Sequence, residues 1–175
     1  MVDLNSELED LNSEMVGLAE MFFDNPDSPT YQVEFLEKSK LDYSLKSLDH
    51  LTSFLDTVHE NRNSIPEKKM NPLILRTGAY LGEVIRRNAK SREFSWVTYE
   101  RAVKIDPTME SIGESISTVA ILYNLKNHFF FFPLGKILKY IHFGASEDIK
   151  GFVKNTLSTK PVRANSSGQI TKIKF

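Results

Sequence analysis

Residues 118–132 read TVAILYNLKNHFFFF, two apolar runs with a polar break between them. The break, Asn124–Asn127, is typical of the loop of a β-hairpin, so residues 118–123 and 128–132 are predicted to be antiparallel strands. Four adjacent phenylalanines place apolar side chains on both faces of the second strand. An exposed edge of that composition would promote aggregation, so this strand is predicted to lie centrally, with helix or chain over both faces.

Further strands are indicated upstream of the hairpin, where the sequence has a period of two. Phe94, Trp96 and Thr98 alternate with Ser95, Val97 and Tyr99, which predicts a strand over residues 94–99. Val103–Ile105 is predicted to add a further short strand. The same alternation over residues 31–36 predicts an extended segment near the N-terminus.

Five helices are predicted from apolar residues that recur every three or four positions. The most regular seam belongs to residues 4–23 and consists of Leu4, Leu8, Leu11, Met15, Leu18 and Phe22. It is expected to pack on the core of its own domain; the alternative is a coiled-coil-like seam that joins two subunits or a partner. The other four helices are expected to begin at Ser44 or Ser47, at Asn71-Pro72, at Pro133 and at Ser146.

Together these elements predict an α+β fold, with about five helices packed on a small antiparallel sheet of three or four strands and a helical N-terminal half. A single domain is expected over residues 1–157, including an acidic amphipathic helix over residues 1–24. Residues 158–175 are expected to form a basic, flexible tail, in which three apolar residues could still dock as a strand: Ile170, Ile173 and Phe175.

Two glycines lie inside the helix predicted from residue 71 to residue 88. Gly78 and Gly82 are four residues apart and therefore share one face of that helix. Glycine costs about 1 kcal/mol relative to alanine inside a helix. Close approach of another backbone to this face is the expected compensation.

Ionised side chains are distributed unevenly along the chain. Ten carboxylates precede the first basic residue, Lys38. Residues 1–60 hold 14 acidic and 3 basic side chains, whereas residues 61–175 hold 9 acidic and 19 basic ones, and the formal net charge is −1. Such separation can be satisfied inside the fold, by self-association or by a partner.

The composition excludes several kinds of chemistry. The chain has no cysteine, which excludes disulfides, thiolate metal sites and cysteine nucleophiles. The four histidines lie in different predicted elements without helical metal-ligand spacing, so no metal and no cofactor are expected. The N-terminus is acidic and the apolar runs are far shorter than the roughly 20 residues of a membrane span, so a cytoplasmic protein without membrane contact is expected.

Glu83 is the best single candidate for a functional polar group. Arg76, Tyr80 and Arg87 share its predicted helix face at spacings of three and four residues. A glutamate and an arginine four residues apart are ordinarily a solvated pair that stabilises the helix, and this interpretation is preferred to a ligand-binding or catalytic role. No residue is therefore assigned a catalytic role.

Three segments carry a resemblance to known domains. They are LDYSLKSL at residues 41–48, LRTGAYLGEVIRRN at residues 75–88, which leads to Trp96, and FPLGK at residues 132–136. They resemble an uncharacterised class of small bacterial α+β domains that includes suspected accessory and immunity-type proteins, which neutralise toxins. The resemblance implies a bacterial origin and rests on structural rather than catalytic motifs. The acidic residues 1–37 lie outside it.

The favoured hypothesis is a non-catalytic protein-binding module, such as an immunity-type inhibitor or a complex subunit, that engages a basic partner through its acidic N-terminal half. Glu7, Asp10 and Glu14 are the candidate partner-binding residues. One alternative is a homo-oligomer, such as a homodimer, in which acidic and basic regions of two copies meet; another is a small enzyme that uses Glu83. Nucleic-acid binding is not expected, because the acidic half opposes it and no recognisable motif is present.

Overall fold

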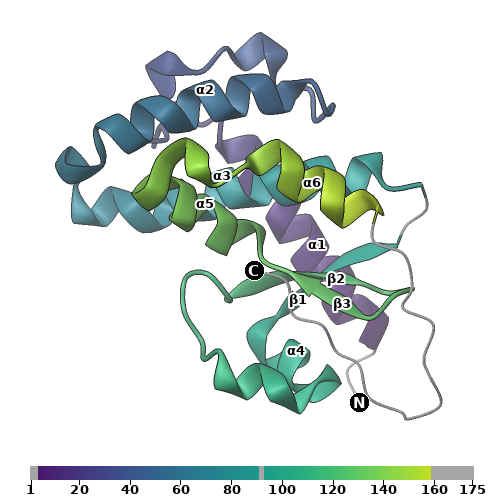
Figure 1. The fold of residues 1–175 in the computed structure, drawn as a ribbon. Helices are drawn as coiled ribbons and strands as arrows, with labels where there is room; N and C mark the ends of the chain where they lie inside the picture. The colour runs from purple at the N-terminus through teal and green to yellow at the C-terminus, as the bar shows by residue number, and fades with distance from the viewer. Residues whose placement is uncertain (1–3, 91–92, 159–175) are drawn as a thin grey trace.

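The computed structural model describes residues 4–90 and 93–158, with side chains described from residue 9 onward. Residues 159–175, which make up most of the predicted basic tail, lie outside the described residues. The α+β fold is confirmed: six helices and a three-stranded antiparallel sheet, with helices dominating the N-terminal half (Figure 1). The elements are α1 (Leu4–Met21), α2 (Ser47–Glu60), α3 (Glu67–Asn88), β1 (Phe94–Thr98), α4 (Tyr99–Ile105), β2 (Ala120–Asn124), β3 (Phe129–Phe131), α5 (Pro133–Phe143) and α6 (Ile149–Ser158).

The sheet has the strand order β1-β2-β3, and both pairs of neighbours are antiparallel. Trp96 pairs with Leu122, and Tyr123 pairs with Phe130, so the hairpin predicted from residues 118–132 is confirmed. The central position predicted for its second strand is wrong, because β2 is central and β3 lies at an edge. β3 has only three residues, and a short edge strand limits pairing with other chains.

Both faces of the sheet are covered, as the phenylalanine run predicts. Phe129 and Phe131 belong to the main core with the long helices, whereas Phe130 and Phe132 belong to a second core with Ala102 of α4. In Figure 1, helices α2, α3, α5 and α6 lie on one side of the sheet and α4 lies on the other. Because neighbouring side chains of a strand point to opposite faces, consecutive phenylalanines reach two separate cores.

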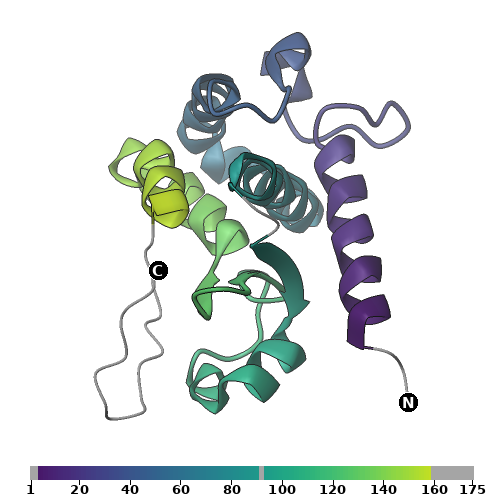
Figure 2. The same cartoon turned by 90° about the vertical axis from the view of Figure 1, so that its right-hand side faces the viewer.

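Helix α3 lies at the centre of the fold. Figure 2 shows it between α1 on one side and α2, α5 and α6 on the other, and residues 76–85 are all buried. The apolar seam of residues 4–23 packs on this core through Met15 and Phe22, which are buried, and through Leu11 and Leu18, which are partly buried. The prediction that the seam packs within its own domain is therefore confirmed for its described part.

The glycines of α3 allow a close approach, as predicted. A Cβ atom at position 78 would lie 2.9 Å from the Cα atom of Leu134, at the start of α5. A Cβ atom at position 82 would overlap the indole ring of Trp96, which is fully buried. Gly78 thus faces the backbone of Leu134, and Gly82 faces the side chain of Trp96. The two glycines therefore set the spacing of α3 from both α5 and the sheet.

Two segments predicted as extended are helical in the structure. Residues 31–36 contain the 3-10 helix Val33–Phe35, because the left-handed backbone of Gln32, with φ 58°, turns the chain. Val103–Ile105 belongs to α4, whose first turn is capped by the Thr98 hydroxyl, which accepts an amide hydrogen bond at 3.2 Å. A run of three residues is too short for its period to distinguish strand from helix.

Two helix starts also differ from the predictions. α3 begins at Glu67 rather than at Asn71-Pro72, and Pro72 lies inside the helix, where it costs one amide hydrogen bond. α6 is capped by Asp148, whose Oδ1 atom accepts an amide hydrogen bond at 2.8 Å. Ser146, the predicted cap, instead ends the preceding 3-10 turn.

Candidate functional site

A buried carboxylate joins α3 to the sheet. Glu83 is 1% exposed, and its Oε1 atom accepts hydrogen bonds from Arg86 Nε at 2.8 Å and from Trp96 Nε1 at 3.0 Å. Its Oε2 atom accepts a longer bond from Arg87 Nε at 3.4 Å. The predicted pairing of glutamate with arginine is present, but the expectation of a solvated pair is wrong, because this carboxylate lies in the core. Its donors all belong to the chain itself, so the carboxylate holds two elements of the fold together.

Arg87 connects the glutamate cluster to two stacked tyrosines. Its guanidinium carbon lies 3.6 Å from the centroid of the Tyr43 ring, and the rings of Tyr43 and Tyr80 stack with centroids 4.8 Å apart. Tyr80 donates a hydrogen bond to Ser47 Oγ at 2.7 Å and accepts one from the Tyr43 amide at 3.2 Å. The Tyr43 hydroxyl is buried and has no hydrogen-bond partner among the described residues. The Tyr43 backbone is left-handed, with φ 61°, so the surrounding contacts hold it in a strained conformation.

The tyrosine pair does not supply an acid or base for neutral pH. Burial raises the pKa of Tyr43 to about 12, and the Arg87 guanidinium opposes this rise only in part. Burial also raises the pKa of Tyr80 above its ordinary value. Both phenols are therefore protonated at neutral pH, and their role in the site is packing and hydrogen bonding.

Removal of the two tyrosine hydroxyls is expected to have different effects on stability. Tyr80→Phe deletes two hydrogen bonds and should lower the free energy of unfolding by about 1–2 kcal/mol. Tyr43→Phe deletes a buried hydroxyl that makes no hydrogen bond within the described part of the chain, so stability should stay unchanged or rise slightly. Urea denaturation of both variants, followed by tryptophan fluorescence, measures the difference. Equal losses in the two variants would contradict this hydrogen-bond assignment.

A groove of about 590 Å³ opens beside the glutamate cluster, between α1, the C-terminal end of α3 and β1. Arg86 and Arg87 line one side, and their side chains remain 25% and 42% exposed. Glu9 of α1 lines the other side. The groove therefore presents charges of both signs to a polar partner.

Helix α1 carries exposed carboxylates outside its buried seam. Glu9, Asp10, Glu14 and Glu20 are exposed, and none forms an ion pair with a cation of the described residues. Of the three predicted partner-binding residues, Asp10 and Glu14 thus lie on one free surface of the helix. The third, Glu7, lies in α1, but its side chain is outside the described part of the chain.

The segment after α1 extends this surface. It adds four exposed carboxylates: Asp24, Asp27, Glu34 and Glu37. Among the described residues only Glu37 has an ion-pair partner, His50, at 3.4 Å. We call the eight carboxylates between residues 9 and 37 the acidic surface.

The residues of the predicted polar face of α3 contact two separate parts of the fold. Tyr80, Glu83 and Arg87 belong to the cluster described above, whereas Arg76 Nη1 donates a hydrogen bond to the Ser28 carbonyl at 2.7 Å. Residues 76 and 87 are about 16 Å apart along the helix axis, since each residue adds about 1.5 Å. A shared helix face therefore does not imply a shared site.

Asn12 is a polar contact that the sequence does not reveal. Its Oδ1 atom accepts a hydrogen bond from the Trp96 amide at 2.9 Å, and its Nδ2 atom donates to Ser95 Oγ at 3.0 Å. Because β1 is an edge strand, this side chain satisfies a backbone group that the sheet leaves open. Its position beside the apolar seam is the only sequence signal, and it does not identify the partner.

The described residues contain no group of three or more histidine, aspartate or glutamate side chains that could hold a metal ion. His59 instead hydrogen-bonds the Ile141 carbonyl through Nδ1 at 2.9 Å, and His128 hydrogen-bonds the Tyr123 hydroxyl at 2.6 Å. Within the same part of the chain, no helix combines the length and apolar character needed to cross a bilayer.

Comparisons with known proteins give no functional assignment. No protein-family model, curated protein or solved structure matches the chain. The function is therefore argued from the geometry and charge of the residues described above.

Proposed function

We propose that this protein is a non-catalytic binding module, of the immunity-inhibitor or complex-subunit kind, whose acidic surface engages a basic surface on another protein. One observation carries the proposal. All eight carboxylates of the acidic surface are exposed, and seven have no ion-pair partner in the described part of the chain. Exposed charges of one sign create a potential that attracts an oppositely charged partner.

The position of α1 supports this proposal. Figure 2 shows α1 at the side of the molecule, with one face toward α3. That face holds the apolar seam, whereas the four described carboxylates of α1 are exposed to solvent. A partner can therefore approach along the helix without displacing any core contact.

Exposed apolar side chains in the N-terminal part of the chain support the same function. Met21, Phe35 and Leu45 are 36%, 56% and 49% exposed, and all three follow the acidic face of α1 in the sequence. In protein interfaces, charges mainly accelerate the encounter and select the partner, whereas buried apolar anchors supply most of the affinity. The N-terminal segment offers side chains of both kinds.

The environment of Glu83 favours binding over catalysis. A catalytic carboxylate must come within hydrogen-bond reach of its substrate. Glu83 is 1% exposed, and both of its oxygens already accept hydrogen bonds from the chain. The enzyme alternative would require this cluster to open.

Charge reversal on α1 tests the acidic surface. The partner is first captured on the tagged wild-type protein from its native cells at low salt. The double variant Asp10→Lys, Glu14→Lys should then associate with that partner about tenfold more slowly, because electrostatic steering is lost. Its association rate should also depend less on salt. Association rates measured by surface plasmon resonance at several salt concentrations check both outcomes.

The matched control is the double variant Glu110→Lys, Glu114→Lys, which has the same net charge as the first variant. Both control positions are exposed and follow α4 in the chain. If the two double variants slow association equally, net charge rather than the acidic surface controls the encounter, and the proposal fails.

Sedimentation tests self-association: a mass near twice 20.0 kDa at low salt, lost in the α1 variant, would identify a second copy as the partner.

A further inference from the structure

Arg76 is a buried cation without an anionic partner in the described residues. It is 7% exposed, and no described carboxylate lies within ion-pair distance of its guanidinium. Burial lowers the pKa of Arg76 below its ordinary value. A buried charge is costly unless an opposite charge or several hydrogen bonds compensate it. Its surroundings therefore indicate which anion could supply that compensation.

Among the described residues, hydrogen bonds are accepted from only one of the three guanidinium nitrogens of Arg76. Nη1 donates to the Ser28 carbonyl at 2.7 Å and to the Thr30 hydroxyl at 3.4 Å. Nε and Nη2 donate to no atom of the described residues. These two nitrogens form the edge of a guanidinium that binds an oxyanion with two parallel hydrogen bonds. Anchoring of the loop by Nη1 leaves this edge unused.

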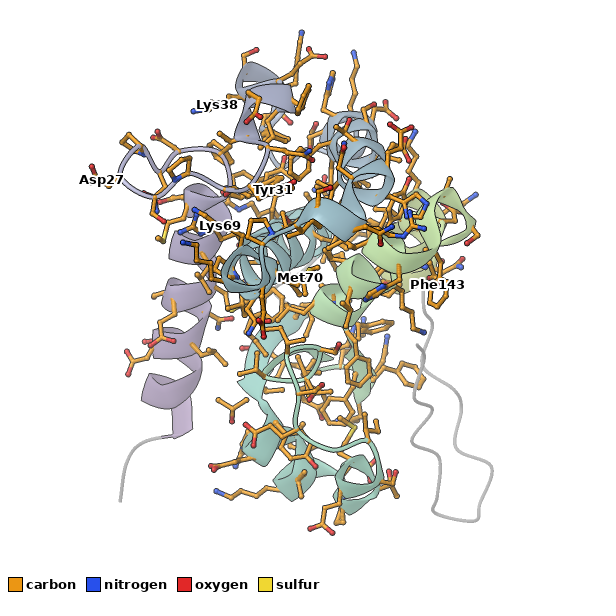
Figure 3. The ribbon with its side chains drawn as sticks, turned by 90° about the vertical axis from the view of Figure 1, so that its left-hand side faces the viewer. Asp27, Tyr31, Lys38, Lys69, Met70 and Phe143 are labelled. Carbon is orange, nitrogen blue, oxygen red and sulfur yellow. The ribbon has the colours of Figure 1, made fainter. Side chains whose placement is uncertain are left out.

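Arg76 lines a pocket of about 260 Å³ that also contains Lys68, Lys69 and Tyr31. None of the described lining residues is acidic. Neither lysine forms an ion pair, and the Tyr31 hydroxyl forms no hydrogen bond, with any described residue. Figure 3 shows Lys69 and Tyr31 on the inner side of the loop after α1, and Asp27 at the outer end of that loop. The pocket thus combines three cations with a hydroxyl donor.

We propose that this pocket binds a phosphoryl group, either as free phosphate or as the phosphate of a small monoester. A phosphate dianion can accept two bonds from the free edge of Arg76 and charge-assisted bonds from the two lysines. The volume of about 260 Å³ lies just below the roughly 300–1,000 Å³ typical of pockets for drug-sized ligands, so the ligand is small. The site shares no residue with the acidic surface and does not depend on the proposed protein binding.

Isothermal titration calorimetry with inorganic phosphate and with glycerol 3-phosphate tests the pocket, with chloride at equal ionic strength as the reference. The wild-type protein should bind at least one of them, with a millimolar or lower Kd. Tighter binding of phosphate would indicate the free anion, and tighter binding of glycerol 3-phosphate would indicate a monoester. The double variant Lys68→Ala, Lys69→Ala keeps the Arg76 anchor and should weaken binding about tenfold.

The matched control is the double variant Lys38→Ala, Lys40→Ala, which removes the same charge from two exposed positions. Lys38 lies well apart from Lys69 in Figure 3. This variant should keep the wild-type Kd within about twofold, since distant exposed charges are screened by salt. Absence of binding above the chloride reference, or equal weakening in both double variants, would overturn the proposal.

Arg76→Lys tests the geometry of the site, because lysine keeps the charge but lacks the two-pronged edge. It should weaken phosphate binding at least tenfold while the thermal unfolding transition remains cooperative. Wild-type affinity in this variant would show that the guanidinium edge does not contact phosphate. If Arg76→Lys does not fold, the two lysine double variants decide the question alone.

Discussion

Gly82→Ala should destabilise the fold by about 3 kcal/mol, since overpacking of a core costs about 1–3 kcal/mol and occasionally more. The added Cβ atom would overlap the six-membered ring of Trp96. The indole has little freedom to move, because it is fully buried and its Nε1 atom donates to Glu83. The gain of about 1 kcal/mol in helix propensity does not offset this overlap. Urea denaturation followed by the fluorescence of Trp96, the single tryptophan, measures the loss.

Gly17→Ala in α1 is the matched control for this substitution. No atom outside the local helix lies within 4 Å of a Cβ atom added there, so the methyl group meets open space. The change should raise the free energy of unfolding by up to about 1 kcal/mol. Gly78→Ala, which meets the Leu134 backbone at 2.9 Å, should behave like Gly82→Ala. If Gly82→Ala were tolerated as well as Gly17→Ala, the close packing of Trp96 on α3 would be contradicted.

The local pattern of apolar and polar residues was enough to predict those helices and strands that keep one pattern along their whole length. The hairpin of residues 118–132 shows two apolar runs around a polar loop, the strand β1 follows a period of two, and α1 follows a period near 3.6. The helix start at Pro133 also agrees with its sequence signal, and α2 begins at Ser47, one of the two predicted positions, although its N-cap residue is Lys46 and forms no side-chain cap hydrogen bond. A short segment such as Val103–Ile105 has too few residues to show a period. This segment is helical because it belongs to α4, whose first turn is capped by Thr98.

The order of the strands depended on information that the hairpin does not contain. Burial of both faces is typical of a central strand and therefore predicted that position for β3. The chain instead buries these faces with the long helices on one side and α4 on the other, which leaves β3 at an edge. Hydrophobicity predicts that a face is covered, but not whether another strand or a helix covers it.

The candidate site was predictable only along one helix. Spacing on α3 correctly placed Glu83 beside Arg87, since both belong to the same local element. The burial of Glu83 depends on Trp96, and the free edge of Arg76 depends on a loop near residue 28. Contacts between distant parts of the chain follow from the packing of whole elements, and no local period encodes them.

Glu83→Leu should lower the free energy of unfolding by about 3 kcal/mol, at the low end of the roughly 3–5 kcal/mol for breaking a buried ion pair, because the arginines partly reach solvent. Leucine removes the acceptor of Arg86 Nε and Trp96 Nε1 and leaves the buried indole N–H without a partner. Glu83→Gln keeps one acceptor oxygen and should cost less, about 1–2 kcal/mol. Urea denaturation of both variants provides the comparison.

Glu60→Gln is the control for the loss of one carboxylate charge, because Glu60 is exposed at the end of α2. The stability of this variant should match that of the wild type.

The comparison of Glu83→Leu with the wild type also separates the structural role of Glu83 from the enzyme alternative. A residue that evolves for catalysis often costs stability, so its replacement by an apolar residue stabilises the fold. A Glu83→Leu protein more stable than the wild type would therefore favour the enzyme alternative. The expected loss of stability would instead identify Glu83 as the polar link between α3 and β1. The acidic surface would then remain the proposed site of partner binding.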